Sequence, residues 1–248
     1  MKDRYFLRFQ HPIATSLIPE KLNDPFGDST PPICDIVAQE LQTYLEKHQK
    51  DWIQNFGLTP TKKGRPKGKM FGILVVRNKA GELGYLQTFS GTLKTEFEKH
   101  SFVPSIFDDS TDDFYINRGM RELTLIGNQI KELDNQEEIS RLKLLRAKKS
   151  TLLQKWLFDQ YLILNNLGET KTVTSIFADL DKNPPAATGE CAAPKLLHHA
   201  FAMEYKPLAI AEFWWGISPK SAQRTHKGYY PACENKCRPI LNYMLGKI

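Results

Sequence analysis

The chain has 248 residues, of which 41% are hydrophobic and 25% are charged, and its formal net charge is +6. This composition supports a folded core and excludes a chain that is disordered throughout. The positive charge favours contact with a polyanion without specifying which one. No run reaches the roughly 18 apolar residues that a membrane helix needs, and the first residues contain no apolar signal core. We therefore expect a cytoplasmic protein that does not contact a membrane.

The first third of the chain is predicted to hold an irregular segment and one helix. Residues 1–33 contain several prolines and show little periodicity, which indicates a lead-in that packs on the main body. Beyond Cys34, apolar residues recur at helical spacing, and Trp52 and Phe56 continue the same stripe. This pattern predicts a helix that continues to Gly57, where a glycine would end it.

A basic loop follows this helix. Its basic residues, with no acidic residue among them, are Lys62, Lys63, Arg65, Lys67 and Lys69. A Gly-Arg-Pro sequence flanked by lysines resembles a minor-groove hook, and lysines in a glycine-containing loop would also contact RNA phosphates. The alternative is a loop whose charges face water without a partner. These five residues are therefore candidates for RNA binding, and a solvated loop is the alternative.

Two β-rich runs come next, at residues 70–76 and 83–89. A short polar loop that contains Gly81 joins them, which predicts a β-hairpin. Much further along the chain, residues 208–215 form another short apolar run that is typical of a buried strand.

A helical arm is predicted between these strands, at residues 118–165. This stretch has no proline, and apolar residues step by three and four before and after an interruption at Asn135. The pattern indicates one long helix or a helical hairpin that turns near Asn135. Its cluster of basic residues spreads around the helix and favours a solvated surface; the members are Arg141, Lys143, Arg146, Lys148 and Lys149. Because isolated helices are marginal in water, the arm must pack on itself, on the body or on a partner.

Three of the four cysteines lie in the last sixty residues. Cys191 stands at the predicted start of a helix, and Cys233 and Cys237 stand just ahead of another, on either side of the 208–215 strand. Helix N-termini favour thiolates, and three thiolates plus a water satisfy tetrahedral zinc. The sequence therefore gives Cys191, Cys233 and Cys237 as candidate zinc ligands. The alternative is that they are buried thiols without a metal.

Several phrases of the chain resemble the long N-terminal extension of some bacterial RluA-type ribosomal pseudouridine synthases. They include GECAAPKLL at 189–197, AEFWWG at 211–216 and YYPACENKC at 229–237. The resemblance implies an accessory region that binds or positions ribosomal RNA. We expect it to be either separated from a pseudouridine synthase catalytic domain, which would then be a partner in trans, or a truncated form of the full enzyme. The Arg-Leu-Asp motif that carries the catalytic aspartate of that family does not occur here. The chain alone is therefore not expected to make pseudouridine.

The order of elements also resembles that of zinc-dependent nucleobase deaminases. In that comparison Cys191 is the first zinc ligand, and Cys233 and Cys237 are the other two. Two departures stand out. Ala193 occupies the position of the glutamate that transfers protons, and the two later cysteines are separated by three residues instead of two. Glu212, on the 208–215 strand, is a candidate for a displaced substitute for that glutamate.

Together these patterns predict an α+β fold, with a small sheet and packed helices in a possible deaminase-like arrangement, interrupted by a helical or coiled-coil arm. The predicted parts are 1–117 and 166–248 for the two halves of the body and 118–165 for the arm. Three functions stay open: an accessory RNA-binding region, a divergent zinc deaminase, and an interaction scaffold that uses the arm to dimerise or to dock a partner.

Overall fold

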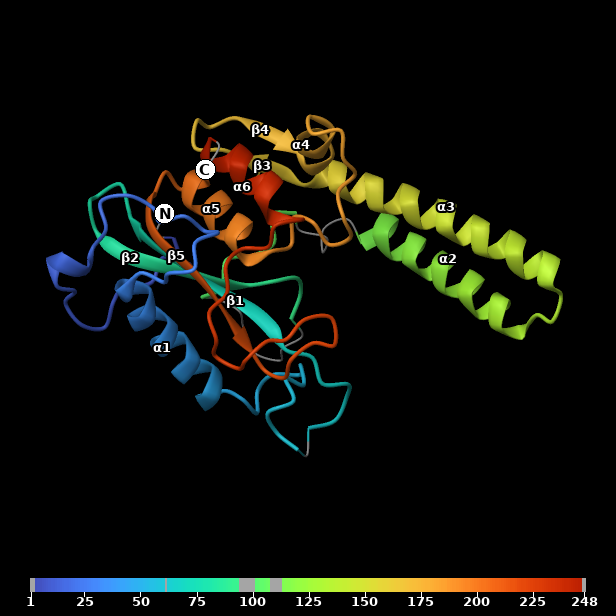
Figure 1. The fold of residues 1–248 in the computed structure, drawn as a ribbon, viewed down its shortest axis with the longest axis horizontal. Helices are drawn as coiled ribbons and strands as arrows, with labels where there is room; N and C mark the ends of the chain where they lie inside the picture. Colours follow the sequence, from blue (N-terminus) through green and yellow to red (C-terminus); the bar gives the residue numbers. More distant parts are fainter. Residues whose placement is uncertain (1–2, 61, 94–100, 108–112, 247–248) are drawn as a thin grey trace.

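The computed structural model describes residues 3–60, 62–93, 101–107 and 113–246. These residues form an α+β fold, as the sequence predicts, in which helices cover both faces of a small antiparallel sheet (Figure 1). A helical hairpin projects from one side of this body, and a short 3-10 turn, η1 (Thr15–Leu17), lies in the N-terminal lead-in.

The sheet contains β1 (Lys69–Arg77), β2 (Leu83–Phe89) and β5 (Lys206–Trp215), in the order β2-β1-β5. β1 and β2 form the predicted hairpin, and β5 pairs antiparallel with the other edge of β1. In this register Gly72 of β1 lies opposite Glu212 of β5. Most residues of the three strands are buried on both faces, which explains why the sequence shows continuous apolar runs there instead of alternation.

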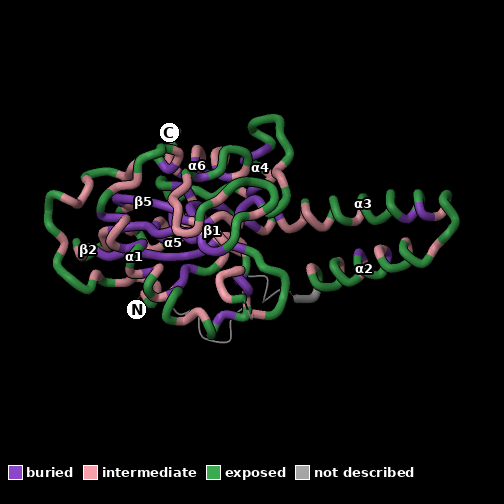
Figure 2. The backbone as a smooth tube through the Cα atoms, turned by 60° about the horizontal axis from the view of Figure 1, so that its bottom comes forward, coloured by how far each residue is buried: buried purple, intermediate pink, exposed green. Residues whose placement is uncertain are grey.

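Each face of the sheet has its own hydrophobic core. α1 (Pro32–Lys47) covers one face, where Phe71 and Phe213 pack against it. α5 (Ala192–Ala202) covers the other face, around Leu74; α6 (Cys237–Leu245) packs on α5, and the short α4 (Val173–Ala178) packs on α6, within the same core. The sheet therefore lies between two helical layers, and Figure 2 shows its strands as a buried centre within a mostly exposed outline.

A second, two-stranded sheet borders the α5 layer. β3 (Leu162–Leu164) and β4 (Thr170–Thr172) pair antiparallel and lead into α4. The sequence assigns the residues of β3 to the arm. In the structure they belong to the body, since Ile163 is fully buried in the core that contains α5. The arm helices therefore end at Gln160, before the predicted boundary at 165.

The predicted helix that continues to Gly57 was wrong in its length. α1 begins at Pro32 and ends at Lys47, and the chain then turns through His48 and Asp51. Trp52 and Phe56 are nevertheless buried, at 1% and 4% exposure, in the core under α1. The spacing of Trp52 and Phe56 correctly indicates that both are buried. An irregular, turned segment buries them as well as another helical turn would.

Of the two alternatives for the arm, one long helix or a helical hairpin, the structure has the hairpin. α2 (Asp113–Glu132) and α3 (Gln136–Gln160) run antiparallel, and the Asn135 side chain caps α3 by accepting hydrogen bonds from the backbone N–H groups of Glu137 and Glu138. Leu123 and Ile126 of α2 are buried in the hairpin, as are two residues of α3, Ile139 and Leu142. Neither of these helices, nor any other within the described ranges, is long and apolar enough to cross a membrane.

Candidate metal centre

Two helix starts meet beside the edge of β5. Cys191 is the N-cap residue of α5, with extended backbone angles that turn the chain into the helix. Cys237 is the first residue of α6, and a tight turn brings Cys233 next to it, with the Cys233 carbonyl accepting hydrogen bonds from Cys237 N and Arg238 N at 3.1 and 3.2 Å. In the chain, β5 lies between α5 and α6. Both helices contribute to the same core, so their N-termini lie on the same side of the sheet.

The three cysteine sulfurs gather at this point. The Sγ atoms of Cys191, Cys233 and Cys237 all lie within 4.8 Å of one another, and those of Cys233 and Cys237 are 3.3 Å apart. Cys237 is buried, Cys191 is partly buried and Cys233 is exposed. Cys34, the remaining cysteine, is buried in the core on the opposite face of the sheet. The structure thus brings together the three residues that the sequence selects, close enough to hold a metal ion.

The cluster also favours a thiolate. Hydrogen bonds from the Cys191 and Cys237 thiols, together with backbone N–H groups at the start of α6, hold the pKa of Cys233 well below its usual range. The same contacts raise the pKa values of Cys191 and Cys237, to which burial also contributes. The negative charge is therefore favoured on Cys233, and a metal cation would stabilise thiolates at this point further.

A buried carboxylate lies next to the cluster. Glu212, at 7% exposure, extends from β5, and its Oε1 atom accepts a hydrogen bond from the backbone N–H of Ala193 at 2.9 Å. Ala193 stands two residues after Cys191, at the position where the deaminase-like layout would have a glutamate. β5 thus brings a carboxylate to the first turn of α5, next to the first cysteine. The sequence suggested Glu212 as a displaced substitute on the 208–215 strand, and the strand register decides its position.

Burial raises the pKa of Glu212 to about 7, while the hydrogen bond from Ala193 opposes this rise. A carboxyl group with such a pKa is divided between its acid and its base form near neutral pH. It can therefore both accept and release a proton, which is the property that general acid–base chemistry requires.

Glu212 also lines a pocket of ≈ 270 Å³. Ala193 and the neighbouring β5 residues Ile210 and Ala211 line it together with the Tyr229–Ala232 segment, and residues 23–25 and 27–30 of the N-terminal lead-in complete the lining. Arg224 lies over the Tyr230 ring, with its Cζ atom 4.0 Å from the ring centroid. The hydroxyl of Tyr230 accepts a hydrogen bond from Thr225 N at 2.7 Å. The pocket thus combines an aromatic wall, a neighbouring cation and a buried carboxylate.

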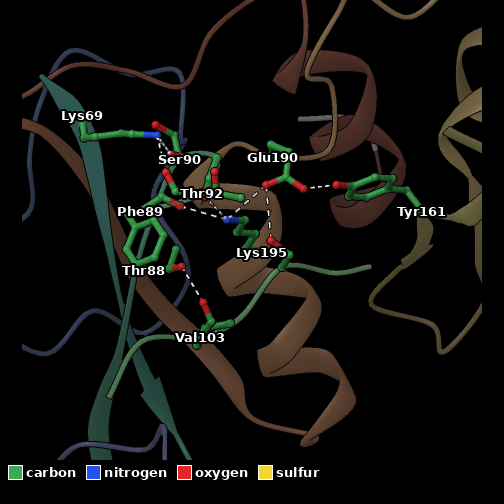
Figure 3. Close-up of polar contacts among 11 residues, drawn as sticks. Lys69, Thr88, Phe89, Ser90, Thr92, Val103, Tyr161, Glu190 and Lys195 are labelled. Carbon is green, nitrogen blue, oxygen red and sulfur yellow. Dashed lines mark hydrogen bonds and ion pairs between the residues drawn. The ribbon is translucent and has the colours of Figure 1, made fainter. Parts of the chain in front are cut away.

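A polar network fixes the residue just before Cys191 (Figure 3). Lys195 of α5 is 1% exposed, and its Nζ atom donates to the carbonyls of Phe89 and Gly91, both at 3.0 Å. The same Nζ atom lies 3.5 Å from the Oε2 atom of Glu190. Glu190 in turn accepts a hydrogen bond from the hydroxyl of Tyr161, at the end of α3. The network therefore ties the start of α5 to the end of β2 and to the base of the helical hairpin.

Sequence reasoning missed Lys195. The feature that could have indicated it is a single lysine inside the apolar run from Ala192 to Leu197. The ammonium group of such a lysine must either reach solvent or find buried hydrogen-bond acceptors. The structure provides the acceptors, and they are mostly backbone carbonyls that no sequence pattern marks.

The structure divides the predicted basic loop into two groups. Lys62 donates to the Trp52 carbonyl, and Lys69 donates to the carbonyls of Ser90 and Thr92 at 3.0 and 2.8 Å. Lys63, Arg65 and Lys67 are exposed. The loop has a defined shape because the Asn55 side chain donates to the carbonyls of Lys62 and Gly64 at 2.8 and 2.9 Å. Three of the five candidate RNA-binding side chains thus face solvent, and two hold the loop in place.

No protein-family model, no curated protein and no solved structure matches the chain. We therefore infer the function from the geometry of the cysteine cluster and its surroundings.

The buried carboxylate predicts a specific pH dependence of stability for the metal-free protein. Because the pKa of Glu212 in the folded chain, about 7, lies above its ordinary value of 4.5, the folded state keeps a proton that the unfolded state releases. The contribution of Glu212 to the unfolding free energy should therefore fall as the pH rises from about 4.5 to about 7. The change Glu212→Gln should remove this decline, which is at most about 3 kcal/mol.

Denaturant unfolding of both proteins between about pH 5 and about pH 8 measures the difference. The exposed Glu20→Gln variant is the control for losing one negative charge. Parallel pH profiles for the wild type and Glu212→Gln would contradict the expected ionisation of the buried group.

Proposed function

We propose that Cys191, Cys233 and Cys237 bind zinc, and that the chain is a zinc-dependent hydrolase that removes the amino group of a nucleobase. The observation that carries the proposal is the meeting of three sulfurs within 4.8 Å with a buried carboxylate that reaches Ala193 from the neighbouring strand. Three thiolates are a soft ligand set that suits zinc and leaves a fourth tetrahedral position for water. On this proposal the body has a deaminase-like arrangement.

Bound zinc would supply a water molecule that ionises near neutral pH. Glu212 would take a proton from that water and deliver it to the departing amine, so that one amino group and one water are exchanged for a carbonyl and ammonia. Its pKa of about 7 suits both steps, because the group is protonated and deprotonated in similar amounts at that pH. The Ala193 N–H would hold the carboxylate in position through its 2.9 Å hydrogen bond.

The pocket beside Glu212 supports a flat heterocyclic substrate. Its volume of ≈ 270 Å³ accommodates a single ring system, and Tyr229 and Tyr230 provide aromatic surface for stacking. Arg224, which lies over the Tyr230 ring, would add a positive charge beside the pocket, whose lining also includes Asp24 and Asp28. The aromatic surface favours a flat base over an aliphatic amine.

RNA positioning is the second candidate function. The exposed side chains of Lys63, Arg65 and Lys67 favour it, on a loop whose shape Asn55 fixes. The resemblance to the extension of RluA-type pseudouridine synthases points in the same direction, with a catalytic domain supplied in trans. In this case the cysteine site would hold zinc as a structural element, and Glu212 would have no catalytic role.

Purified wild-type protein should contain close to one zinc per chain, because three thiolates at two helix starts provide nearly a complete ligand set. Elemental mass spectrometry measures the ratio. Cys233→Ser should lose most of the metal, whereas Cys34→Ala, which removes the cysteine on the opposite face of the sheet, should retain it. Metal-free wild-type protein that also fails to bind added zinc would rule out the site.

Glu212→Gln should retain zinc and lose hydrolysis. The substitution keeps the size of the side chain but removes proton transfer, which is worth roughly 10² to 10⁴ in rate. Ammonia release is measured with cytidine, adenosine, guanosine and a mixed-sequence RNA oligonucleotide as substrates. Release that is equally fast in Glu212→Gln would remove Glu212 from the mechanism. No release from any of these substrates, with zinc bound, would contradict deamination and leave the RNA-positioning candidate.

The second candidate predicts weaker RNA binding when Lys63, Arg65 and Lys67 are all changed to Gln. Three lost phosphate contacts should reduce the slope of log affinity against log salt concentration by about 2 for single-stranded RNA. Fluorescence anisotropy with a mixed-sequence oligonucleotide measures the slope. The combined change of Lys21, Lys182 and Lys206 to Gln removes the same charge at exposed sites elsewhere. An equal effect in both triple variants would show that the loop has no special role.

A further inference from the structure

Positive charge is concentrated at one end of the sheet, where β1 begins and β5 ends (Figure 1). Residues 52–69 contain five basic residues, residues 213–233 contain three, and neither segment contains an acidic residue. With histidine neutral, the two segments carry +8, whereas the whole chain carries +6, so the remaining residues together carry −2. We call the surface of these two segments the basic end. A surface of this charge attracts a polyanion.

The two segments are in direct contact. The Ile217 N atom donates to the Phe56 carbonyl at 2.8 Å. A Cβ atom at Gly68 would lie 2.5 Å from the Ile217 carbonyl oxygen, and one at Gly216 would lie 2.9 Å from the Cα atom of Gly68. The segments therefore meet backbone to backbone, which the missing side chains of both glycines allow. The basic end is one continuous surface and not two separate loops.

Part of this charge is used inside the protein, and part faces solvent. The Lys227 Nζ atom lies 2.6 Å from the Glu46 carboxylate, and Lys62 and Lys69 donate to backbone carbonyls. The exposed basic residues of the two segments are Lys63, Arg65, Lys67 and Lys220. Because several cations lie on one surface, they suit a chain of phosphates better than a single small anion.

An aromatic ring lies among these charges. Trp214 is partly exposed and belongs to neither hydrophobic core. Its Nε1 atom donates to the Ile217 carbonyl at 2.9 Å, and a Cβ atom at Gly68 would lie 2.5 Å from its ring. The ring is therefore held against the contact between the two segments. An indole ring that is held in this way and still meets solvent offers a surface on which an unpaired base stacks.

β5 connects this ring with the proposed reaction site. Trp214 follows Glu212 by two residues, so the two side chains leave the same face of the strand about 7 Å apart. Alongside β5, the Trp214 N atom donates to the Gly228 carbonyl at 2.9 Å, and the Tyr230 N atom donates to the Glu212 carbonyl at 3.0 Å. Tyr230 also lines the pocket beside Glu212. The basic end and the pocket are thus neighbouring parts of one surface.

The pocket itself carries the opposite charge. Its lining includes Asp24 and Asp28, both exposed, and among the described residues it contains no lysine or arginine. A phosphate is therefore repelled from the lead-in side of the pocket and attracted to the basic end. This division of charge suits a substrate whose base enters the pocket while its phosphates stay outside.

We propose that the substrate is an unpaired base within a single-stranded nucleic acid. The phosphates contact the exposed cations of the basic end, a neighbouring base stacks on Trp214, and the reacting base enters the pocket beside Glu212. This inference rests on the proposed hydrolysis at that pocket. A nucleic acid is favoured over an acidic protein because it presents phosphates, a stacking base and an amino-bearing base together. RNA and DNA share this chemistry, whereas a base in a duplex must first leave its stack.

Ammonia release by the zinc-loaded full-length chain tests the proposal. The probes are mixed-sequence single-stranded RNA and DNA of about 12 nucleotides, and the reference substrates are the matching free nucleosides. In the wild type, kcat/KM should be at least about tenfold higher for an oligonucleotide than for the nucleosides at low salt. This ratio should fall at least about tenfold when the exposed cations are removed, because four phosphate contacts are lost. The combined variant carries Lys63→Gln, Arg65→Gln, Lys67→Gln and Lys220→Gln.

Two further comparisons separate a specific role from general damage. The matched control removes four exposed lysines elsewhere, through Lys21→Gln, Lys148→Gln, Lys182→Gln and Lys206→Gln, and should keep the ratio. Trp214→Ala should lower the ratio roughly tenfold, whereas Trp214→Phe should keep most of it because a phenyl ring still stacks on a base. A variant that only disturbs the fold would lower both activities together and leave the ratio unchanged.

Activity on RNA, on DNA or on both, with the expected loss in the combined variant, would support the proposal and identify the sugar. Equal kcat/KM for nucleosides and oligonucleotides in the wild type would overturn it and leave hydrolysis at Glu212 intact. So would an equal fall of the ratio in the combined and control variants. No release from any nucleoside or oligonucleotide, with zinc bound, would instead overturn the hydrolysis itself and this proposal with it.

Discussion

The close approach of α5 to β1 at Gly72 is the constraint on which the site depends. A Cβ atom at this position would lie 2.7 Å from the Cβ of Ala192 and 3.1 Å from a methyl group of Leu196, so any larger residue would push the helix away from the sheet. Ala192 directly follows Cys191, and Gly72 lies opposite Glu212 in the neighbouring strand. A single missing side chain thus sets the distance between the first cysteine, the buried carboxylate and the sheet.

The buried charges around α5 are consistent with this close packing. A lysine and a glutamate within a core are costly unless polar groups surround them. Lys195 has the carbonyls of Phe89 and Gly91 and the Glu190 carboxylate, and Glu212 has the Ala193 N–H. These contacts join β2, β5 and the end of α3 to the first turn of α5. The helix start that carries Cys191 is therefore held from several directions, which is what a preorganised metal site requires.

Much of this arrangement could be predicted from the sequence. The apolar runs defined the three strands of the sheet, the break at Asn135 located the turn of the hairpin, and the spacing of Cys191, Cys233 and Cys237 selected the cluster. Local patterns carry that information. The contact between Glu212 and Ala193 could not be predicted, because it depends on the register between β1 and β5 and on how closely α5 packs. The burial of Lys195 was hidden for a similar reason, since its acceptors are backbone carbonyls. The end of α1 at Lys47 was missed because Trp52 and Phe56 are buried equally well by a turn.

X-ray absorption spectroscopy at the zinc edge of the zinc-loaded protein tests whether the three cysteines hold one zinc ion. We expect three sulfur ligands at about 2.3 Å and one lighter oxygen ligand at the remaining tetrahedral position. That result would establish that two helix starts hold one metal with a position open to water. A spectrum with four sulfur ligands, or with zinc bound mainly by nitrogen and oxygen, would contradict it, because the metal would then lie outside the cluster or would bridge separate chains.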